Sequence, residues 1–145
     1  MRTDRNLYLL GLGSNLGDRA EYLSSALTEI KAKIGPILRS SKLYETEPVG
    51  AADLLFLNAA AIVVTTFPPA EVMTALLAIE TALGRTRKAR WENRTIDLDI
   101  LLWGHEEQAM PTVFQTNTWA SPELTIPHPL MLERTFALVP AAEIA

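Results

Sequence analysis

The 145-residue sequence predicts an α+β sandwich in which two amphipathic helices cover one face of an antiparallel sheet. Stretches with the period of a helix alternate with short apolar or β-branched stretches, in the order β-α-β-β-α-β. Apolar residues make up 48% of the chain and charged residues 21%, as in a globular domain with one buried core. We therefore expect a single domain over residues 1–145 with the ferredoxin-like βαββαβ topology.

The first strand and the first helix are indicated near the N-terminus. Residues 7–13 form an apolar run that ends in glycine, which is typical of a buried strand followed by a tight turn. Asp18 and Glu21 have the spacing of a capping box, so a helix is expected to begin there. Gly35 and Pro36 are expected to end it. The apolar face of this helix is expected to comprise Leu23, Leu27, Ile30 and Ile34.

The middle of the chain predicts two further strands and the second helix. Residues 37–44 are expected to form a strand, residues 45–55 a loop, and residues 56–66 a strand that ends in a β-branched run. Pro68 and Pro69 are expected to open the second helix, because proline is favoured in a first helical turn. The inner face of that helix is expected to comprise Val72, Leu76, Ile79 and Leu83.

A basic loop at residues 85–94 leads into the predicted fourth strand, Thr95 to Leu102. In this strand Asp97 and Asp99 alternate with apolar residues, so both carboxylates point to one face, roughly 7 Å apart. The helices are expected on the opposite face. Residues 103–145 are then expected to form a C-terminal extension over the open face.

Two carboxylates on the open face of a strand are costly unless a cationic group meets them. Mg²⁺ fits, because it takes oxygen ligands and is usually shared between carboxylates and substrate phosphates. The alternative is a solvated strand face neutralised by nearby arginines, and the alternation alone does not separate the two. The basic loop favours a polyphosphate site, because arginine forks and Mg²⁺ together satisfy phosphate oxygens. Its cations are Arg85, Arg87, Lys88, Arg90 and Arg94.

The composition excludes several classes of function. The chain has no cysteine, which excludes disulfides, thiolate metal sites and a cysteine nucleophile. Only His105 and His128 remain as soft metal ligands, which argues against zinc. A net charge of −4 argues against general nucleic-acid binding. The N-terminus shows neither a signal peptide nor a spanning helix, so we expect a cytoplasmic protein with no membrane partner.

Five stretches, in order along nearly the whole chain, match the motifs of one enzyme family. They are Gly-Ser-Asn-Leu-Gly-Asp-Arg (13–19), Tyr-Glu-Thr-Glu-Pro-Val-Gly (44–50), Phe-Leu-Asn-Ala-Ala (56–60), Gly-Arg-Thr-Arg through Arg-Thr-Ile-Asp-Leu-Asp-Ile (84–100) and Ile-Pro-His-Pro through Arg-Thr-Phe (126–136). Together they resemble the 6-hydroxymethyl-7,8-dihydropterin pyrophosphokinases. The resemblance implies a ferredoxin-like fold, two Mg²⁺ ions, and transfer of the β,γ-pyrophosphoryl group of ATP to the pterin 6-hydroxymethyl oxygen. AMP is released, and the product serves folate biosynthesis.

The resemblance also implies site residues. The implied catalytic residues are Arg85, Arg87, Arg94, Asp97 and Asp99, of which the two aspartates are the implied metal ligands. The implied ATP-binding residues are Glu80, Trp91, Arg94, Ile100, Thr125, His128 and Arg134. The implied pterin-binding residues are Thr46, Val49, Phe56, Asn58 and Phe136. Among these, Phe56 and Phe136 are expected to sandwich the ring and Asn58 to hydrogen-bond its edge, while Asp97 is hypothesised to help take the hydroxyl proton. ATP and the pterin are the expected partners, and the chain is expected to be a monomer.

Two other functions would also suit parts of the pattern. A nucleotidyltransferase can pair a Gly-Ser turn with two aspartates, but Gly13 and Ser14 lie some 80 residues before Asp97 rather than close ahead of it. A ferredoxin-like RNA-binding module would need exposed aromatic residues on its central strands. The fourth strand offers Asp97 and Asp99 instead, which repel phosphate unless a metal is bound.

Overall fold

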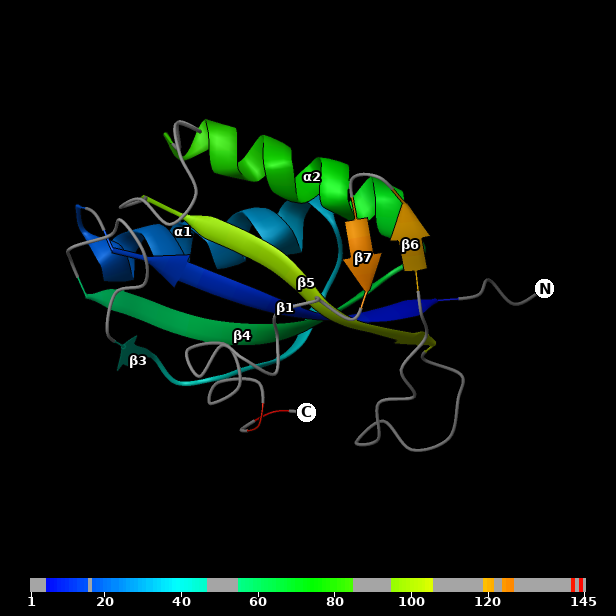
Figure 1. The fold of residues 1–145 in the computed structure, drawn as a ribbon, viewed down its shortest axis with the longest axis horizontal. Helices are drawn as coiled ribbons and strands as arrows, with labels where there is room; N and C mark the ends of the chain where they lie inside the picture. Colours follow the sequence, from blue (N-terminus) through cyan, green and yellow to red (C-terminus); the bar gives the residue numbers. More distant parts are fainter. Residues whose placement is uncertain are drawn as a thin grey trace.

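The computed structural model describes residues 5–15, 17–46, 55–84, 95–105, 119–121 and 124–126, together with residues 142 and 144. Its elements are β1 (Asn6–Ser14), α1 (Arg19–Lys33), β2 (Ile37–Ser40), β3 (Tyr44–Thr46), β4 (Phe56–Thr65), α2 (Pro69–Ala82), β5 (Asp97–His105), β6 (Trp119–Ser121) and β7 (Leu124–Ile126). Figure 1 shows the arrangement. No helix among the described residues has the length and apolar content needed to cross a membrane.

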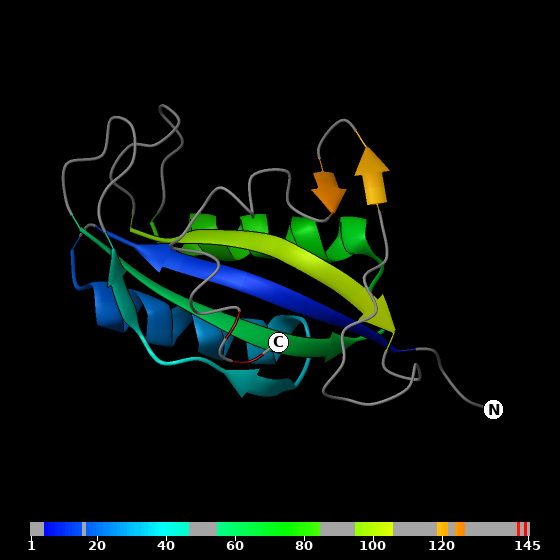
Figure 2. The ribbon, with the colours of Figure 1, turned by 60° about the horizontal axis from the view of Figure 1, so that its bottom comes forward.

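The sheet is antiparallel, with strand order β2-β4-β1-β5, and β3 pairs with β4 beyond the end of β2. Both helices lie behind it in the view of Figure 2. The predicted α+β, ferredoxin-like order βαββαβ is therefore confirmed. The hairpin of β6 and β7 was not predicted, and its strand β7 contacts β5.

The predicted strand at residues 37–44 is two strands in the structure. β2 ends at Ser40 and β3 begins at Tyr44. Between them, Ala60 N donates a hydrogen bond to Ser41 Oγ, and Ser41 N donates one to Ala60 O, both at 2.8 Å. The side chain of Ser41 thus takes the place of a ladder carbonyl and allows the chain to bend. The predicted loop is wrong for residues 45 and 46, which belong to β3.

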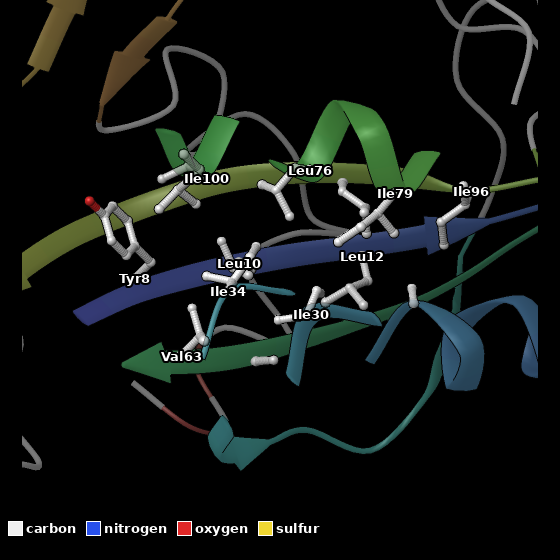
Figure 3. Packing of buried hydrophobic residues seen from close by; sticks show 14 of the residues in the cluster. Tyr8, Leu10, Leu12, Ile30, Ile34, Val63, Leu76, Ile79, Ile96 and Ile100 are labelled. Atoms are coloured by element: carbon white, nitrogen blue, oxygen red, sulfur yellow. The ribbon is translucent and has the colours of Figure 1, made fainter. Parts of the chain in front are cut away.

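The main core lies between the helices and the sheet (Figure 3). Every second residue of the central strands points into it, as the two-residue period of a strand requires. Burying one such Leu or Ile side chain stabilises the fold by about 1.5–3 kcal/mol. The buried members are Tyr8, Leu10, Leu12, Leu23, Ala26, Ile30, Ile34, Ala61, Val63, Val72, Leu76, Ile79, Ile96, Leu98 and Ile100.

The predicted signals at the ends of α1 are confirmed. Asp18 Oδ1 accepts a hydrogen bond from Glu21 N at 3.2 Å, which caps the first turn. The chain leaves the helix through Gly35, where an added Cβ would lie 2.0 Å from Val64 O. Only glycine therefore lets the end of α1 approach the backbone of β4 this closely.

A second, smaller apolar cluster lies on the face of the sheet away from the helices. We call it the apolar half of that face; it consists of Leu7, Leu9, Ala60, Ile62, Val64, Leu101 and Ile144, with Leu102 packed against it. The register of β1 with β5 shifts between Leu9 and Leu10, which marks a bulge at Leu101. The bulge explains why neighbouring residues Leu101 and Leu102 both contribute to this face. Ile144, which is buried here, agrees with an extension that crosses the open face.

Candidate active site

The sheet face away from the helices carries polar side chains and glycines beside its apolar half. In the sheet register, Gly13 of β1 lies between Asn58 of β4 and Asp97 of β5. Gly11 lies next to Asp99 in the same way. Directly opposed residues share a face of the sheet, with Cβ atoms about 4.5–5.5 Å apart. We call this region the polar half: Gly11, Gly13, Phe56, Asn58, Asp97 and Asp99.

Gly13 allows two side chains of β4 to lie over β1. A Cβ at this position would lie 2.9 Å from Asn58 Oδ1 and 3.5 Å from Phe56 Cδ1. Asn58 is only 3% exposed, whereas Phe56 is half-buried. The row continues into β3, where Tyr44 pairs with Asn58. The absence of a side chain on β1 thus makes room for an amide and an aromatic ring over the strand that separates β4 from the aspartates of β5.

The predicted alternation along the fourth strand is confirmed, although β5 runs from Asp97 to His105 rather than from Thr95 to Leu102. Ile96, Leu98 and Ile100 are buried against the helices, and Asp97 and Asp99 are half-buried on the other side. Within the described ranges, no three His, Cys, Asp or Glu side chains gather as a metal-binding group. A metal held by this pair would need further oxygen ligands from its substrate or from water.

Glu80 supports the same strand from the helix side. Its side chain is 2% exposed, and its Oε2 accepts a hydrogen bond from Leu98 N at 2.7 Å. β5 is an edge strand, so this N–H points away from β1 and would otherwise lack a ladder partner. At 2.7 Å the bond is short for an N–H donor. Glu80 therefore fixes the backbone between Asp97 and Asp99. The sequence held a signal for this, since Glu80 lies on the apolar face of α2.

The predicted site residues fall into four groups. The structure brings Phe56, Asn58, Asp97 and Asp99 together in the polar half. Glu80 and Ile100 have buried side chains on the helix side, so Ile100 can meet a ligand only through its backbone. Thr46 pairs with Phe56, and Thr125 lies in β7, which contacts β5. The remaining predicted residues lie outside the described ranges: Val49, Arg85, Arg87, Trp91, Arg94, His128, Arg134 and Phe136.

Comparison with known proteins gives a consistent answer. The family model described as 7,8-dihydro-6-hydroxymethylpterin-pyrophosphokinase matches residues 9–145. A Bacillus subtilis 2-amino-4-hydroxy-6-hydroxymethyldihydropteridine pyrophosphokinase is 41% identical over 141 residues, covering 96% of this chain and 78% of the relative. The enzyme of the same name from Porphyromonas gingivalis is 40% identical over 140 residues, covering 94% of this chain and 88% of the relative.

Solved structures share the fold. A Plasmodium falciparum HPPK-DHPS triple mutant with SDX-DHP superposes with a TM-score of 0.66 at 18% identity, over 94% of this chain and 40% of that one. The chain thus spans less than half of that larger protein. At this identity the likeness concerns the fold alone. The sequence matches go further: the chain belongs to the 7,8-dihydro-6-hydroxymethylpterin-pyrophosphokinase family, whose ATP-dependent enzymes transfer a pyrophosphoryl group to hydroxymethyldihydropterin in folate biosynthesis.

Proposed function

We propose that the polar half is the active site, with the pterin on its β3–β4 side and the phosphates of ATP on its β5 side. The observation that carries this proposal is the row Asn58, Gly13, Asp97. Neighbouring strands lie about 4.8 Å apart, so Asn58 and Asp97 are separated by roughly 10 Å across the sheet. A bicyclic pterin whose far edge meets the amide of Asn58 would extend its hydroxymethyl arm toward Asp97.

On the pterin side, Phe56 offers an aromatic face and Asn58 a buried amide. A flat heterocycle with polar edges suits this combination, because stacking and hydrogen bonding act in perpendicular directions. We assign the opposite face of the ring to Phe136, and further contacts to Val49 and the backbone of Thr46. Because Asn58 is almost fully buried, its amide is held in one place and can select a ring whose polar edge matches it.

On the phosphate side, we assign two Mg²⁺ ions to Asp97 and Asp99. The fit rests on two half-buried carboxylates that share one face, with oxygen as the only ligand type that they offer. Bound Mg²⁺ would neutralise the charge that develops on the phosphate oxygens. Arg85, Arg87 and Arg94 are proposed to hold the transferring group by forked hydrogen bonds. Trp91, His128 and Arg134 are proposed to contact the nucleotide.

The outer edge of β5 is proposed to face the nucleotide. Leu98 N points to this edge, where Glu80 accepts its hydrogen bond. Residues two apart in a strand direct their backbone groups to the same edge, so the N–H and C=O of Ile100 also point outward. Thr125 lies in β7, which contacts β5. By holding the backbone of β5 at Leu98, Glu80 is proposed to position this edge for the nucleotide.

The proposed reaction is an in-line displacement at the β-phosphorus. The hydroxymethyl oxygen of the pterin forms the new bond, the bond from the β-phosphorus to the α,β-bridging oxygen breaks, and AMP leaves. Asp97 takes the hydroxyl proton as the oxygen attacks, acting as a general base. The chain's own part is to orient the two substrates and to balance charge, which needs no covalent nucleophile.

We propose that the protein acts as a monomer in the cytoplasm, where ATP is available. Light scattering at assay concentration should then give a mass near 16.0 kDa. A mass of twice this value would contradict the monomer.

The test of the proposed site is product analysis with Mg²⁺, ATP and 6-hydroxymethyl-7,8-dihydropterin. We expect stoichiometric AMP that appears only with the pterin present and stops when EDTA is added. Asn58→Ala should raise the KM for the pterin and leave the KM for ATP unchanged. Equal effects of Asn58→Ala on both KM values, or turnover that persists in EDTA, would contradict the assignment.

A further inference from the structure

Arg19, the first residue of α1, joins the two strands that carry the pterin side of the proposed site. Its Nη2 lies 2.8 Å from Glu45 Oε2 in β3. Its Nη1 donates a hydrogen bond of 2.9 Å to Leu55 O, one residue before β4. Glu45 pairs with Leu57, whose side chain packs on the helix side of the sheet. The guanidinium thus holds both strands from the face opposite the pterin.

We propose that Arg19 is a positioning residue for the pterin: it fixes β3 against β4 and so sets the geometry around Phe56 and Asn58. This inference rests on the pterin site proposed above. β3 has three residues and, among the described strands, pairs only with β4. So short a strand has few ladder hydrogen bonds to hold its register. An additional tie from a helix therefore has a larger effect here than on a long central strand.

The position of Arg19 is itself fixed by the turn before it. Gly17 has φ +77°, a conformation that favours glycine, and an added Cβ there would lie 3.0 Å from the ring of Tyr22. Asp18 then caps α1. The helix consequently begins at a defined residue, and the backbone that carries the Arg19 side chain is fixed. This gives residues 17–19 of the Gly-Ser-Asn-Leu-Gly-Asp-Arg stretch a role in placing strands.

The chemistry of arginine suits this role. A guanidinium presents several donors in a rigid plane and can bind a carboxylate and a carbonyl at once, which the single ammonium of lysine does less well. The side chains of Arg19 and Glu45 are 31% and 50% exposed. An ion pair so accessible to water contributes little to global stability, so its effect should appear in local geometry.

The same helix offers a matched control. At its far end Lys33 Nζ lies 3.2 Å from Glu29 Oε1, with side-chain exposures of 50% and 31%. This pair has the same character as Arg19 and Glu45 but joins residues within α1 alone. Loss of either pair removes one cation from α1. Only the loss of the Arg19 pair also removes a contact that holds β3 against β4.

The experiment compares Arg19→Met with Lys33→Met in steady-state assays of the full chain. We expect Arg19→Met to raise the KM for the pterin about three- to tenfold, with kcat and the KM for ATP within about twofold. Arg19→Lys should lie between Arg19→Met and the unchanged protein, because an ammonium can keep one of the two contacts. Lys33→Met should leave all three parameters unchanged.

A second pair of variants keeps the test decisive if Arg19→Met folds poorly. Glu45→Gln should raise the pterin KM in the same direction, and combining it with Arg19→Lys should give less than the product of the two effects. The inference is overturned if the pterin KM of the Arg19 and Glu45 variants stays unchanged, or if the KM for ATP rises in parallel.

Phe56→Ala separates this inference from the site on which it rests. If Phe56→Ala raises the pterin KM and Arg19→Met leaves it unchanged, the role of Arg19 is refuted but the pterin site is not. Unchanged pterin binding in Phe56→Ala refutes the pterin site, and the positioning role with it.

Discussion

The apolar half and the polar half of the open face are built on the same three strands, β1, β4 and β5, but carry different side chains. Along β1 the outward residues change from Leu7 and Leu9 to Gly11 and Gly13. Between them, Tyr8, Leu10 and Leu12 of the same strand point inward and belong to the main core. One continuous core on the inner face therefore underlies two different halves on the outer face, one apolar and packed, the other polar and proposed to bind the substrates. The comparison teaches that glycines on a central strand can make room for a polar surface while the core beneath the strand stays the same.

If this comparison holds, substitutions in the polar half should change catalysis, and substitutions in the apolar half should change stability. The largest effect is expected for Asp97→Asn. Removing the proposed base and metal ligand should lower kcat for AMP formation about 10²- to 10⁴-fold while the protein stays folded. Glu71→Gln, an exposed carboxylate on α2, is the matched control and should keep its full rate. An Asp97→Asn enzyme with full kcat would remove Asp97 from the mechanism.

In the apolar half, Leu9→Ala should reduce the free energy of unfolding by about 2–5 kcal/mol, because Leu9 is 1% exposed and its loss leaves a cavity. Urea denaturation measures this change. The KM for the pterin should stay within about twofold at a temperature where the variant is folded. A large rise in pterin KM with little loss of stability would show that the two halves are not separate.

Gly13→Ala should raise the pterin KM about tenfold, since its Cβ would meet Asn58 Oδ1 and displace a buried amide by a fraction of an ångström. Gly11, in the same half but beside Asp99, is the comparison. A Cβ there would lie 3.3 Å from Leu101 Cδ1, at the flexible end of a side chain, so Gly11→Ala should raise the pterin KM less than Gly13→Ala. Steady-state kinetics of both variants compare the two positions. Equal pterin KM values for the two variants would contradict a pterin ring that lies over Gly13.

The smallest effect is expected on the helix side, where Tyr8 OH donates a hydrogen bond to Phe67 O at 2.7 Å. Tyr8→Phe should cost about 0.5–1.5 kcal/mol of stability, with no kinetic effect. Burial, together with the charge of Glu71, raises the pKa of the Tyr8 hydroxyl above its ordinary value. The folded protein therefore holds this proton more tightly than the unfolded chain.

This raised pKa makes stability depend on pH in one direction. The contribution of Tyr8 is complete below about pH 10 and is lost as the pH rises from there toward the folded-state pKa. Urea titrations at pH 8 and above pH 10 should show a steeper decline for the unchanged protein than for Tyr8→Phe. Parallel declines would contradict a buried, protonated Tyr8.

The sequence predicted those parts of the molecule that depend on local pattern. The cap at Asp18 and the faces of both helices follow from residues a few positions apart, and so does the alternation around Asp97 and Asp99. The family motifs located the polar half, because Phe56, Asn58 and the aspartates stand in contiguous stretches of the sequence.

Other features depend on contacts between distant segments, which a local pattern does not contain. The bend at Ser41 exists because its hydroxyl meets Ala60 in β4. The bulge at Leu101 falls within an unbroken apolar run, where no alternation marks a change of face. The contacts of Arg19 with Glu45 and Leu55 span 26 and 36 residues of the sequence. Only the folded chain brings these groups together.

The most direct test of the central claim is a crystal structure of the complex with Mg²⁺, a non-hydrolysable ATP analogue and 6-hydroxymethylpterin. The account predicts the pterin ring over Gly13, stacked on Phe56 and hydrogen-bonded to Asn58, with its hydroxymethyl oxygen toward Asp97. A ring seated over the apolar half, or an aspartate pair that contacts neither metal nor phosphate, would contradict it.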